Sequence, residues 1–569
     1  MDKTIPAFPV EMDSFPVDPM DLEKCCVSGL FKETIRLNGE GESYCLLTYL
    51  PTGIHNGAAH WVIIPPAAES PAAFFYGSGL QPLAEKENFF VHILCPPEAG
   101  SWEAVPNRKE YAAALLKTLN ARTCYVGCAS GVRAVYLLGA GDGGRLAYSL
   151  AATCAELFVG VCVYGAKQRD LSACAGEDNP PIPLWVWAEP EEQLPDGFWE
   201  MWKKRNCCQD EAYSTTAWDR IYLPRQVVGA AGFNDNAAAP LRISCCTDVQ
   251  EEAGMQKRLP AIWKFLSRYR RYVGAGETYL RCYESPEAVG AEQHWMVHAG
   301  LRRRWYEYVP DAAPFESEKG YPLVVVLHGR GGTPENFFDS CRMWRVARQR
   351  RFIAVFPQAH CYQQYGPHGI RNVSMWNYPD GDLSADSIGF IRHMVEDVKG
   401  RYPVDSSRIY CCGQSSGGMM SVQMALHASD LFAAVASWST GALPNAAIPI
   451  TEPVIPVFLM RGELDGLQRQ KEFPEYPFQC NTLLKGMMDY FLDRYGIEKK
   501  AKEYASGIYH YYVYEKEGVP LVTFSNVKDM PHANIAEESW LAYDLFLSKF
   551  SRGADGTLFY MGAPYRPGR

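Results

Sequence analysis

Short apolar runs recur along the chain, separated by turn residues and by longer amphipathic stretches. In the first half, these runs predict strands at 44–50, 60–64, 72–76, 91–94 and 134–138, and a helix at 111–119. Short strands that alternate with helices are typical of a mostly parallel sheet with helices on both faces. The residues before Ser43 are proline-rich and weakly patterned, which predicts an arm on the surface.

The second half repeats this order of elements. Strands are predicted at 305–309, 323–327, 353–356, 409–412, 457–460 and 522–524, with helices at 386–398, 418–428 and from 535 to 550. A shift of 274 residues (415 − 141) places Tyr136 on Tyr410 and Gly139 on Gly413. Similar pairings set 76–77 opposite 328–329, 95–96 opposite 356–357, 183–186 opposite 456–459, and 265–268 opposite 546–549. We therefore predict two copies of one α/β fold, at 1–274 and 275–569, with a seam near 272–277.

One stretch of the second copy indicates chemistry. The predicted strand at 409–412 leads directly into Gly413-Gln414-Ser415-Ser416-Gly417, and helix-forming residues follow. A G-x-S-x-G between a strand and a helix is the pattern of a nucleophile elbow, because the sharp turn leaves little room for side chains beside the serine. Ser415 is thus the predicted nucleophile, at the N-terminus of a helix that favours negative charge.

A serine hydroxyl needs a base, and the base needs an acid to orient it. The order serine, acid, histidine along this type of fold selects Asp465, which follows the strand at 457–460, and His532, in the loop before the last helix. Glu463 is the competitor for the acid. His427 and His510 fall inside predicted elements and fit the base less well.

The oxyanion that forms during acyl transfer needs two backbone N–H donors. Ser416, directly after the nucleophile, supplies one. The glycine-rich segment 327–332, Leu-His-Gly-Arg-Gly-Gly, follows an early strand and supplies the other, and we predict Arg330 as its donor.

These segments together resemble the α/β-hydrolase esterases of the polyhydroxybutyrate depolymerase and feruloyl esterase group. The resemblance covers about 302–550 and rests on 327–332, 376–378, 386–391, 413–420, 430–436 and 530–532. It implies a catalytic triad of Ser415, Asp465 and His532. It also implies that the substrate-binding residues are His328, Gly329, Gln414 and Trp376. The acid segment reads Arg-Gly-Glu-Leu-Asp rather than the commoner H-G-x-x-D, a departure that bears on Asp465.

The first copy lacks the same chemistry. Gly141 occupies the position of the serine, Glu192 falls opposite Asp465, and no histidine corresponds to His532. Asp142 is a poor alternative nucleophile, because it occupies the position after the nucleophile. We predict a non-catalytic α/β-hydrolase-like domain that shapes the neighbouring site, binds part of the substrate, mediates assembly into a homo-oligomer, or only stabilises its partner.

Composition narrows the class of protein. Hydrophobic residues make up 47% of the chain and the formal net charge is −10, which disfavours nucleic acid and anionic membranes as partners. The 19 cysteines include no C-x-x-C pair, and no leader or membrane-length apolar run is visible, so we expect a reducing cytoplasm and no metal or cofactor.

The sequence thus predicts a serine esterase that acts on a small ester, on resemblance a hydroxycinnamoyl or short-chain acyl ester. Two alternatives remain open: a serine peptidase or amidase with the same triad, and a binding or scaffold protein in which both copies are inactive.

Overall fold

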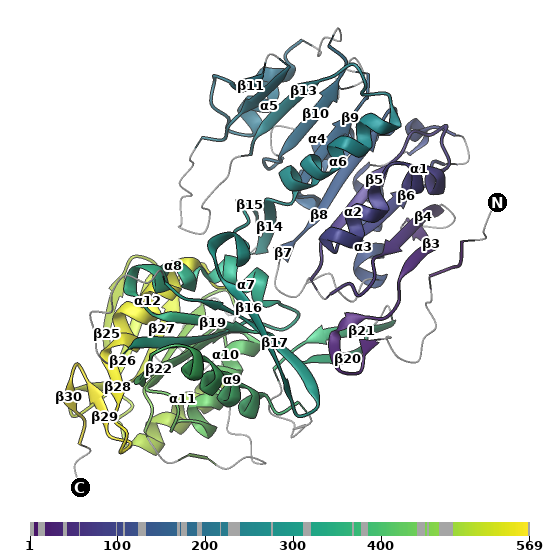
Figure 1. Cartoon of the computed structure of the whole chain (residues 1–569). Helices are drawn as coiled ribbons and strands as arrows, with labels where there is room; N and C mark the ends of the chain where they lie inside the picture. Colours follow the sequence, from purple (N-terminus) through teal and green to yellow (C-terminus); the bar gives the residue numbers. More distant parts are fainter. Residues whose placement is uncertain are drawn as a thin grey trace. The chain divides into compact units, whose positions relative to one another are not determined.

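The computed structural model describes residues 5–8, 17–37, 43–55, 57–97, 100–105, 108–122, 132–167, 171, 179–190, 196–216, 218–225, 239–274, 277–310, 320–366, 369–376, 385–440, 450–451, 454–465 and 482–566. The chain divides into two compact units (Figure 1). Unit 1 comprises 1–18, 23–283 and 363–372, and unit 2 comprises 19–22, 284–362 and 373–569. The main boundary, at 283/284, lies after the predicted one at 274/275, because the hairpin of β14 (Tyr269–Gly274) and β15 (Glu277–Cys282) stays with unit 1.

Unit 1 is built on a sheet of ten strands. Their spatial order is β11 (Tyr213–Thr216), β12 (Asp219–Tyr222), β13 (Leu241–Cys245), β10 (Leu184–Ala188), β9 (Gly160–Tyr164), β8 (Val135–Ala140), β5 (His60–Ile64), β6 (Phe90–Leu94), β4 (Ser43–Leu50) and β3 (Gly29–Arg36). The strands from β13 to β6 run parallel, and the flanking strands pair antiparallel.

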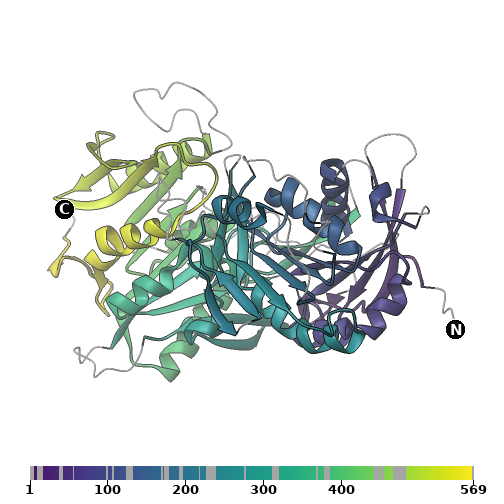
Figure 2. The ribbon, with the colours of Figure 1, turned by 90° about the horizontal axis from the view of Figure 1, so that it is seen from above.

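Helices cover both faces of this sheet (Figure 1 and Figure 2). One buried cluster joins the sheet to α3 (Arg108–Arg122), α4 (Gly143–Thr153) and α5 (Phe198–Arg205). A second cluster joins the opposite face to α1 (Pro71–Gly77), α2 (Leu80–Glu87) and α6 (Glu252–Leu266).

The sheet of unit 2 has the same order and the same directions. It runs β16 (Glu292–His298), β17 (Leu301–Tyr308), β19 (Ile353–Pro357), β18 (Tyr321–Leu327), β22 (Val404–Gln414), β23 (Ala434–Trp438), β24 (Val457–Gly462), β27 (Val519–Val527), β26 (Tyr509–Lys516) and β25 (Lys502–Ser506). Its helices are α7 (Pro334–Cys341), α8 (Met343–Arg350), α9 (Ser387–Arg401), α10 (Ser416–His427), α11 (Thr482–Tyr495) and α12 (Ala536–Leu541). The prediction of two α/β units of one fold is confirmed.

Smaller elements complete the described chain. They are the strands β1 (Val17–Asp18), β2 (Asp21–Cys25), β7 (Val132–Arg133), β20 (Cys361–Gly366), β21 (Gly369–Ser374), β28 (Phe550–Arg552), β29 (Leu558–Tyr560) and β30 (Ala563–Pro564). Among the described residues, no helix is long and apolar enough to cross a membrane.

Equivalent side-chain contacts recur in the two units. The hydroxyl of Tyr136 donates to the carbonyl of Tyr269 at 2.6 Å, and that of Tyr410 donates to the carbonyl of Phe550 at 2.7 Å. A buried arginine reaches back to the sheet in each unit, from Arg271 Nε to Phe158 O at 2.7 Å and from Arg552 Nε to Phe432 O at 3.0 Å. A shared register of this kind supports the conclusion that the two units are copies.

Three details of the sequence prediction are wrong. The segment 72–76 belongs to helix α1, since Ser70 and Pro71 begin a helix there. Ile64 pairs with Gly139, and Leu327 pairs with Gly413 in the same way, so Ile64 and Leu327 are counterparts. The counterpart of 328–329 is therefore 65–66 and not 76–77. The pairing of 95–96 with 356–357 is also out of register. The arm before Ser43 contains strand β3, whose alternating buried and exposed side chains place it at the edge of the sheet.

Candidate active site

The nucleophile elbow has the predicted form of strand, turn and helix. β22 ends at Gln414 and α10 begins at Ser416, and Ser415 between them has φ 54° and ψ −119°. A non-glycine residue rarely adopts positive φ, and such strain is typical of functional turns. A Cβ on Gly413 would lie 2.5 Å from Gly417 O, and one on Gly417 would lie 2.1 Å from Leu327 O. Both glycines are therefore required by the close approach of α10 to the sheet.

The structure brings Ser415, His532 and Asp465 together. His532 Nε2 lies 2.9 Å from Ser415 Oγ, and His532 Nδ1 lies 2.9 Å from Asp465 Oδ1. Because a carboxylate only accepts hydrogen bonds, the ring proton is on Nδ1, which donates a hydrogen bond to Asp465. Nε2 is then the acceptor for the Ser415 hydroxyl. This is the arrangement that a general base needs to activate a serine.

Asp465, not Glu463, is the acid beside the histidine. Glu463 Oε2 instead accepts the backbone N–H of Asp529 at 3.0 Å, so it holds the start of the loop that carries His532. The side chain of Asp465 is 5% exposed, and the guanidinium of Arg461, equally buried, lies 3.6 Å from its Oδ1. Arg461, which stands where the commoner pattern H-G-x-x-D has histidine, thus lies close enough for its positive charge to compensate the buried negative charge of Asp465.

Ser439 is a residue of the site that sequence reasoning missed. It follows strand β23, has φ 60°, and its hydroxyl donates to the carbonyl of Ala533 at 2.5 Å. This hydrogen bond ties the residue after His532 to the sheet. Its counterpart in unit 1, Gly165, has φ 67°, so both units make a turn with positive φ directly after this strand. That shared turn is the feature of the sequence that could have indicated Ser439.

Buried side chains support the loop after β18 through hydrogen bonds to its backbone. His328 Nδ1 donates to Gly329 O at 2.7 Å, and its Nε2 accepts from the backbone N–H of Ala359 at 3.0 Å. Burial lowers the pKa of His328 to about 4, which keeps the ring neutral. Trp376 Nε1 donates to His328 O at 2.9 Å, and the backbone N–H of Trp376 donates to Ser416 Oγ at 3.2 Å.

The substrate-binding residues implied by the resemblance divide into two groups. The side chains of His328 and Trp376 are 1% and 0% exposed, so they support the loop and do not face a substrate, which corrects that expectation. Gly329 lies against the elbow, where a Cβ would come within 2.5 Å of Gln414 Oε1 and 3.4 Å of Ser415 Cβ. Arg330, which follows, is exposed. Gly329 and Gln414 therefore lie beside Ser415. Their contact with a substrate, and the role of the Arg330 N–H as an oxyanion donor, stay predictions.

The elbow of unit 1 has the same backbone without the nucleophile. Gly141 has φ 55°, and its N–H donates to Tyr164 O at 2.9 Å, as the Ser415 N–H donates to Trp438 O at 2.9 Å. Asp142, the counterpart of Ser416, accepts at Oδ1 the backbone N–H of Ala67 at 2.9 Å.

The register of β5 and β18 makes Ala67 the counterpart of Arg330. In unit 1, the backbone N–H that corresponds to the predicted oxyanion donor is therefore already hydrogen bonded to the carboxylate of Asp142. Asp142 is engaged in this contact and is not placed as a nucleophile. By residue count along β13 and β27, Glu251 stands where His532 stands in unit 2.

Three of the positions named from the sequence lie outside the described residues: Glu192, Asn377 and Tyr378. Among the residues that the structure describes, no group of three or more His, Cys, Asp or Glu side chains could hold a metal ion.

Comparison with known proteins identifies relatives of unit 2. Residues 304–465 match the family described as Esterase PHB depolymerase. The chain is 32% identical over 140 residues to feruloyl esterase B of Neurospora crassa, covering 24% of this chain and 43% of that protein. It is 28% identical over 136 residues to poly(3-hydroxyalkanoate) depolymerase C of Paucimonas lemoignei, covering 24% of this chain and 31% of that protein. The chain thus spans less than half the length of these curated relatives.

The comparison with solved structures also finds an acetyl xylan esterase from Aspergillus awamori. Its TM-score is 0.32 at 17% identity, over 44% of this chain and 98% of that one.

Proposed function

Since residues 304–465 match the Esterase PHB depolymerase family, we propose that this protein is a serine carboxyl-ester hydrolase that works through an acyl-enzyme. The proposal rests on the hydrogen-bonded series Ser415, His532 and Asp465, with 2.9 Å at each step. A serine with positive φ at a helix N-terminus, aligned with a histidine and a buried acid, is suited to nucleophilic catalysis.

The reaction follows from this geometry. Ser415 Oγ attacks the ester carbonyl carbon while His532 Nε2 accepts its proton. Asp465 holds the ring in the correct tautomer and stabilises the imidazolium that forms. The backbone N–H groups of Ser416 and Arg330 receive the oxyanion. His532 then protonates the departing alcohol, and a water molecule activated by the same nitrogen releases the acid.

We propose a small hydroxycinnamoyl or short-chain acyl ester as the substrate. The support is the similarity of unit 2 to proteins named feruloyl esterase B and acetylxylan esterase. Arg330 is exposed and follows Gly329, which lies against the elbow, so we propose it as a contact for the substrate.

An ester panel tests this proposal. Methyl ferulate, p-nitrophenyl acetate and a matched p-nitroanilide are each offered to the wild type and to Ser415→Ala. We expect hydrolysis of at least one ester by the wild type, loss in the variant, and slower cleavage of the anilide. Faster cleavage of the anilide would favour the peptidase or amidase alternative. An aligned triad disfavours the scaffold alternative, because a protein without catalysis has no need of a strained serine.

Two further proposals concern the whole protein. We propose a cytoplasmic location, supported by the free thiols of the described cysteines, and self-association through unit 1. Cell fractionation tests the first, and light scattering of unit 1-deleted and full-length chains tests the second.

A further inference from the structure

Two cysteines of unit 1 face each other across neighbouring strands. In the antiparallel pair of β4 and β6, Leu46 lies opposite Leu94. One residue further, the backbone N–H of Cys95 donates to the carbonyl of Cys45 at 3.1 Å. Directly opposed residues project their side chains from the same face of the sheet. The two thiols therefore adjoin on that face of the sheet, where each affects the pKa of the other.

The surroundings make the two thiols unequal. Both are half-buried at the margin of the same core cluster, which includes Trp61. The neighbouring Cys95 thiol and the positive charge of Lys32 on the adjacent strand β3 lower the pKa of Cys45. The pKa of Cys95 is raised, because its proton is held by the Cys45 sulfur and by burial. Cys45 is thus the nucleophilic partner and Cys95 the proton-bearing one.

The backbone spacing suits a covalent bond between them. Opposed, hydrogen-bonded residues in an antiparallel pair have Cα atoms about 5.5 Å apart, inside the range of about 4.4–6.8 Å that disulfides span. Their Cβ atoms, about 5 Å apart, must approach to about 4 Å, so closing the bond strains the pair and makes it easily reduced. Buried thiols elsewhere, such as Cys162, Cys411 and Cys412, have raised pKa values and behave as inert core residues.

We propose that Cys45 and Cys95 form a redox-sensitive pair, which a hydroperoxide oxidises to a disulfide between β4 and β6. This site is separate from the proposed esterase chemistry and uses none of its residues.

The chemistry takes two steps. The thiolate of Cys45 attacks one oxygen of hydrogen peroxide, the O–O bond breaks, and a proton is taken up, which gives a sulfenic acid and water. The thiol of Cys95 then loses its proton and attacks the Cys45 sulfur; the S–O bond breaks and a second water leaves. Two thiols are oxidised to one disulfide, and one peroxide is reduced to two waters.

Peptide mapping of the full chain tests the proposal. The reduced protein is treated at pH 7 with one equivalent of hydrogen peroxide, denatured, and blocked with N-ethylmaleimide. We expect a linked pair of peptides that contain Cys45 and Cys95, lighter by two hydrogen atoms than their sum. We also expect alkylation of Cys45 in the native protein to rise with pH through a midpoint below that of an ordinary thiol, because its pKa is lowered.

Variants separate this pair from general thiol oxidation. In Cys95→Ser, the sulfenic acid of Cys45 should persist and react with dimedone, whereas Cys45→Ser should give no adduct at Cys95. Cys26, an exposed thiol of the same unit, is the internal control. Oxidation of Cys45 no faster than that of Cys26, or recovery of both cysteines as separate maleimide adducts, would overturn the proposal.

Discussion

At the scale of single residues, the orientation of the His532 ring is the feature on which the proposed chemistry depends. Its Nδ1 faces a carboxylate that is 5% exposed and its Nε2 faces the serine hydroxyl. The ring itself is 45% exposed, so it is reachable from solvent. A rigid, buried acid behind an accessible imidazole holds one tautomer while leaving the catalytic nitrogen open to substrate.

The substitution Asp465→Asn tests this orientation. An amide can donate to Nδ1, which favours the tautomer with its proton on Nε2 and leaves no base for Ser415. We expect kcat to fall by about 10⁴-fold with the protein still folded. Glu463→Gln is the matched control, because glutamine still accepts the N–H of Asp529 and should leave kcat nearly unchanged. Equal losses in the two variants, measured by ester hydrolysis, would refute the assignment of the acid.

Glu538 is a second residue with a testable consequence. It is fully buried in the first turn of α12, where its Oε2 accepts the N–H of Ile535 at 2.9 Å, and burial raises its pKa to about 8. The unfolded chain loses this proton near pH 4.5, so the folded state holds one proton more between about pH 4.5 and 8. Stability should therefore fall as the pH rises through this window.

The substitution Glu538→Gln should remove that fall and raise stability relative to the wild type at pH 8. Urea unfolding at pH 5, 6.5 and 8 measures the effect, with the exposed Glu537→Gln as the control. A stability difference between Glu538→Gln and the wild type that does not change with pH would contradict the raised pKa.

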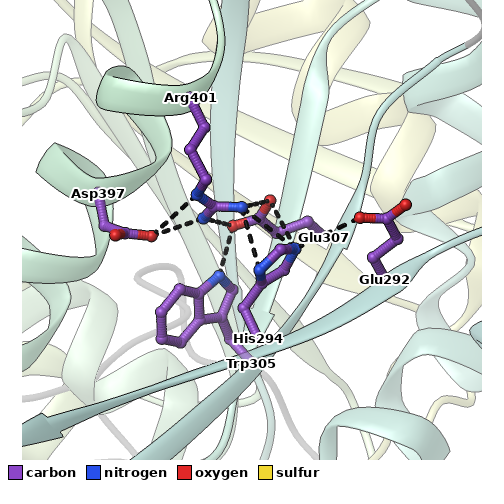
Figure 3. Close-up of polar contacts among 6 residues, drawn as sticks. All are labelled: Glu292, His294, Trp305, Glu307, Asp397 and Arg401. Carbon is purple, nitrogen blue, oxygen red and sulfur yellow. Dashed lines mark hydrogen bonds and ion pairs between the residues drawn. The ribbon is translucent and has the colours of Figure 1, made fainter.

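At the scale of elements, hydrogen bonds to a buried carboxylate link helix α9 to the edge of the unit 2 sheet. The side chain of Glu307, 0% exposed, accepts hydrogen bonds from Trp305 Nε1 at 2.6 Å and from Arg401 Nη1 at 2.8 Å (Figure 3). Arg401 also pairs with Asp397, and His294 Nε2 lies 3.3 Å from Glu307 Oε2. These contacts join β16, β17 and the last turn of α9.

Arg401→Gln should destabilise unit 2 by about 3 kcal/mol, since it leaves Glu307 buried without its guanidinium partner. Arg392→Gln, on the same helix, is the control: its pair with Asp430 is exposed and contributes at most about 1 kcal/mol. Denaturant midpoints of the two variants give the comparison. A loss in Arg401→Gln as small as that in the control would show that the network is not coupled to stability.

The sequence predicted those elements whose local pattern is unambiguous. The runs 61–64 and 323–327 are apolar and buried, and the two glycines of the elbow allow only a sharp turn between strand and helix. It failed where tertiary context decides. Residues 72–76 are apolar enough for a strand but form a helix. Strand β3 was missed because Glu33, a charged residue, occupies one of its buried positions and interrupts the alternation.

The same limit applies to the candidate site. Spacing and chain order were sufficient to find Ser415, Asp465 and His532, whereas burial decides what a neighbouring side chain does. His328 and Trp376 carry polar atoms next to the elbow, but those atoms bond to backbone beneath the loop. Ser439 contacts Ala533, which is distant in sequence, and no local pattern indicates that contact. Arg461 lies only four residues before Asp465, but its sequence position does not show that the two side chains are buried together.

At the scale of the whole molecule, one fold occurs twice, and among the described residues only unit 2 aligns a serine, a histidine and a carboxylate in one hydrogen-bonded series. In unit 1 the backbone of the elbow persists at Gly141, but the carboxylate of Asp142 accepts the N–H of Ala67. We therefore propose that unit 1 keeps the fold without catalysing the reaction.

Gly141→Ser tests whether the nucleophile alone is missing from unit 1. The backbone already has the required positive φ, and a Cβ there would lie 3.2 Å from Pro66 Cγ, so a small shift of the proline ring admits the side chain. In a Ser415→Ala background, we expect a folded protein whose introduced serine does not react with a fluorophosphonate, because Glu251 is no base equivalent and Asp142 fills the N–H site. Labelling of the introduced serine would show that unit 1 retains a working site.

Whether Ser415 is an activated nucleophile is decided by intact-mass labelling of the full chain with a fluorophosphonate. We expect one adduct on the wild type, mapped to Ser415 and absent from Ser415→Ala, with a labelling rate that falls in Asp465→Asn. A folded wild-type protein that takes up no adduct, or takes it up elsewhere than at Ser415, would contradict the proposed mechanism.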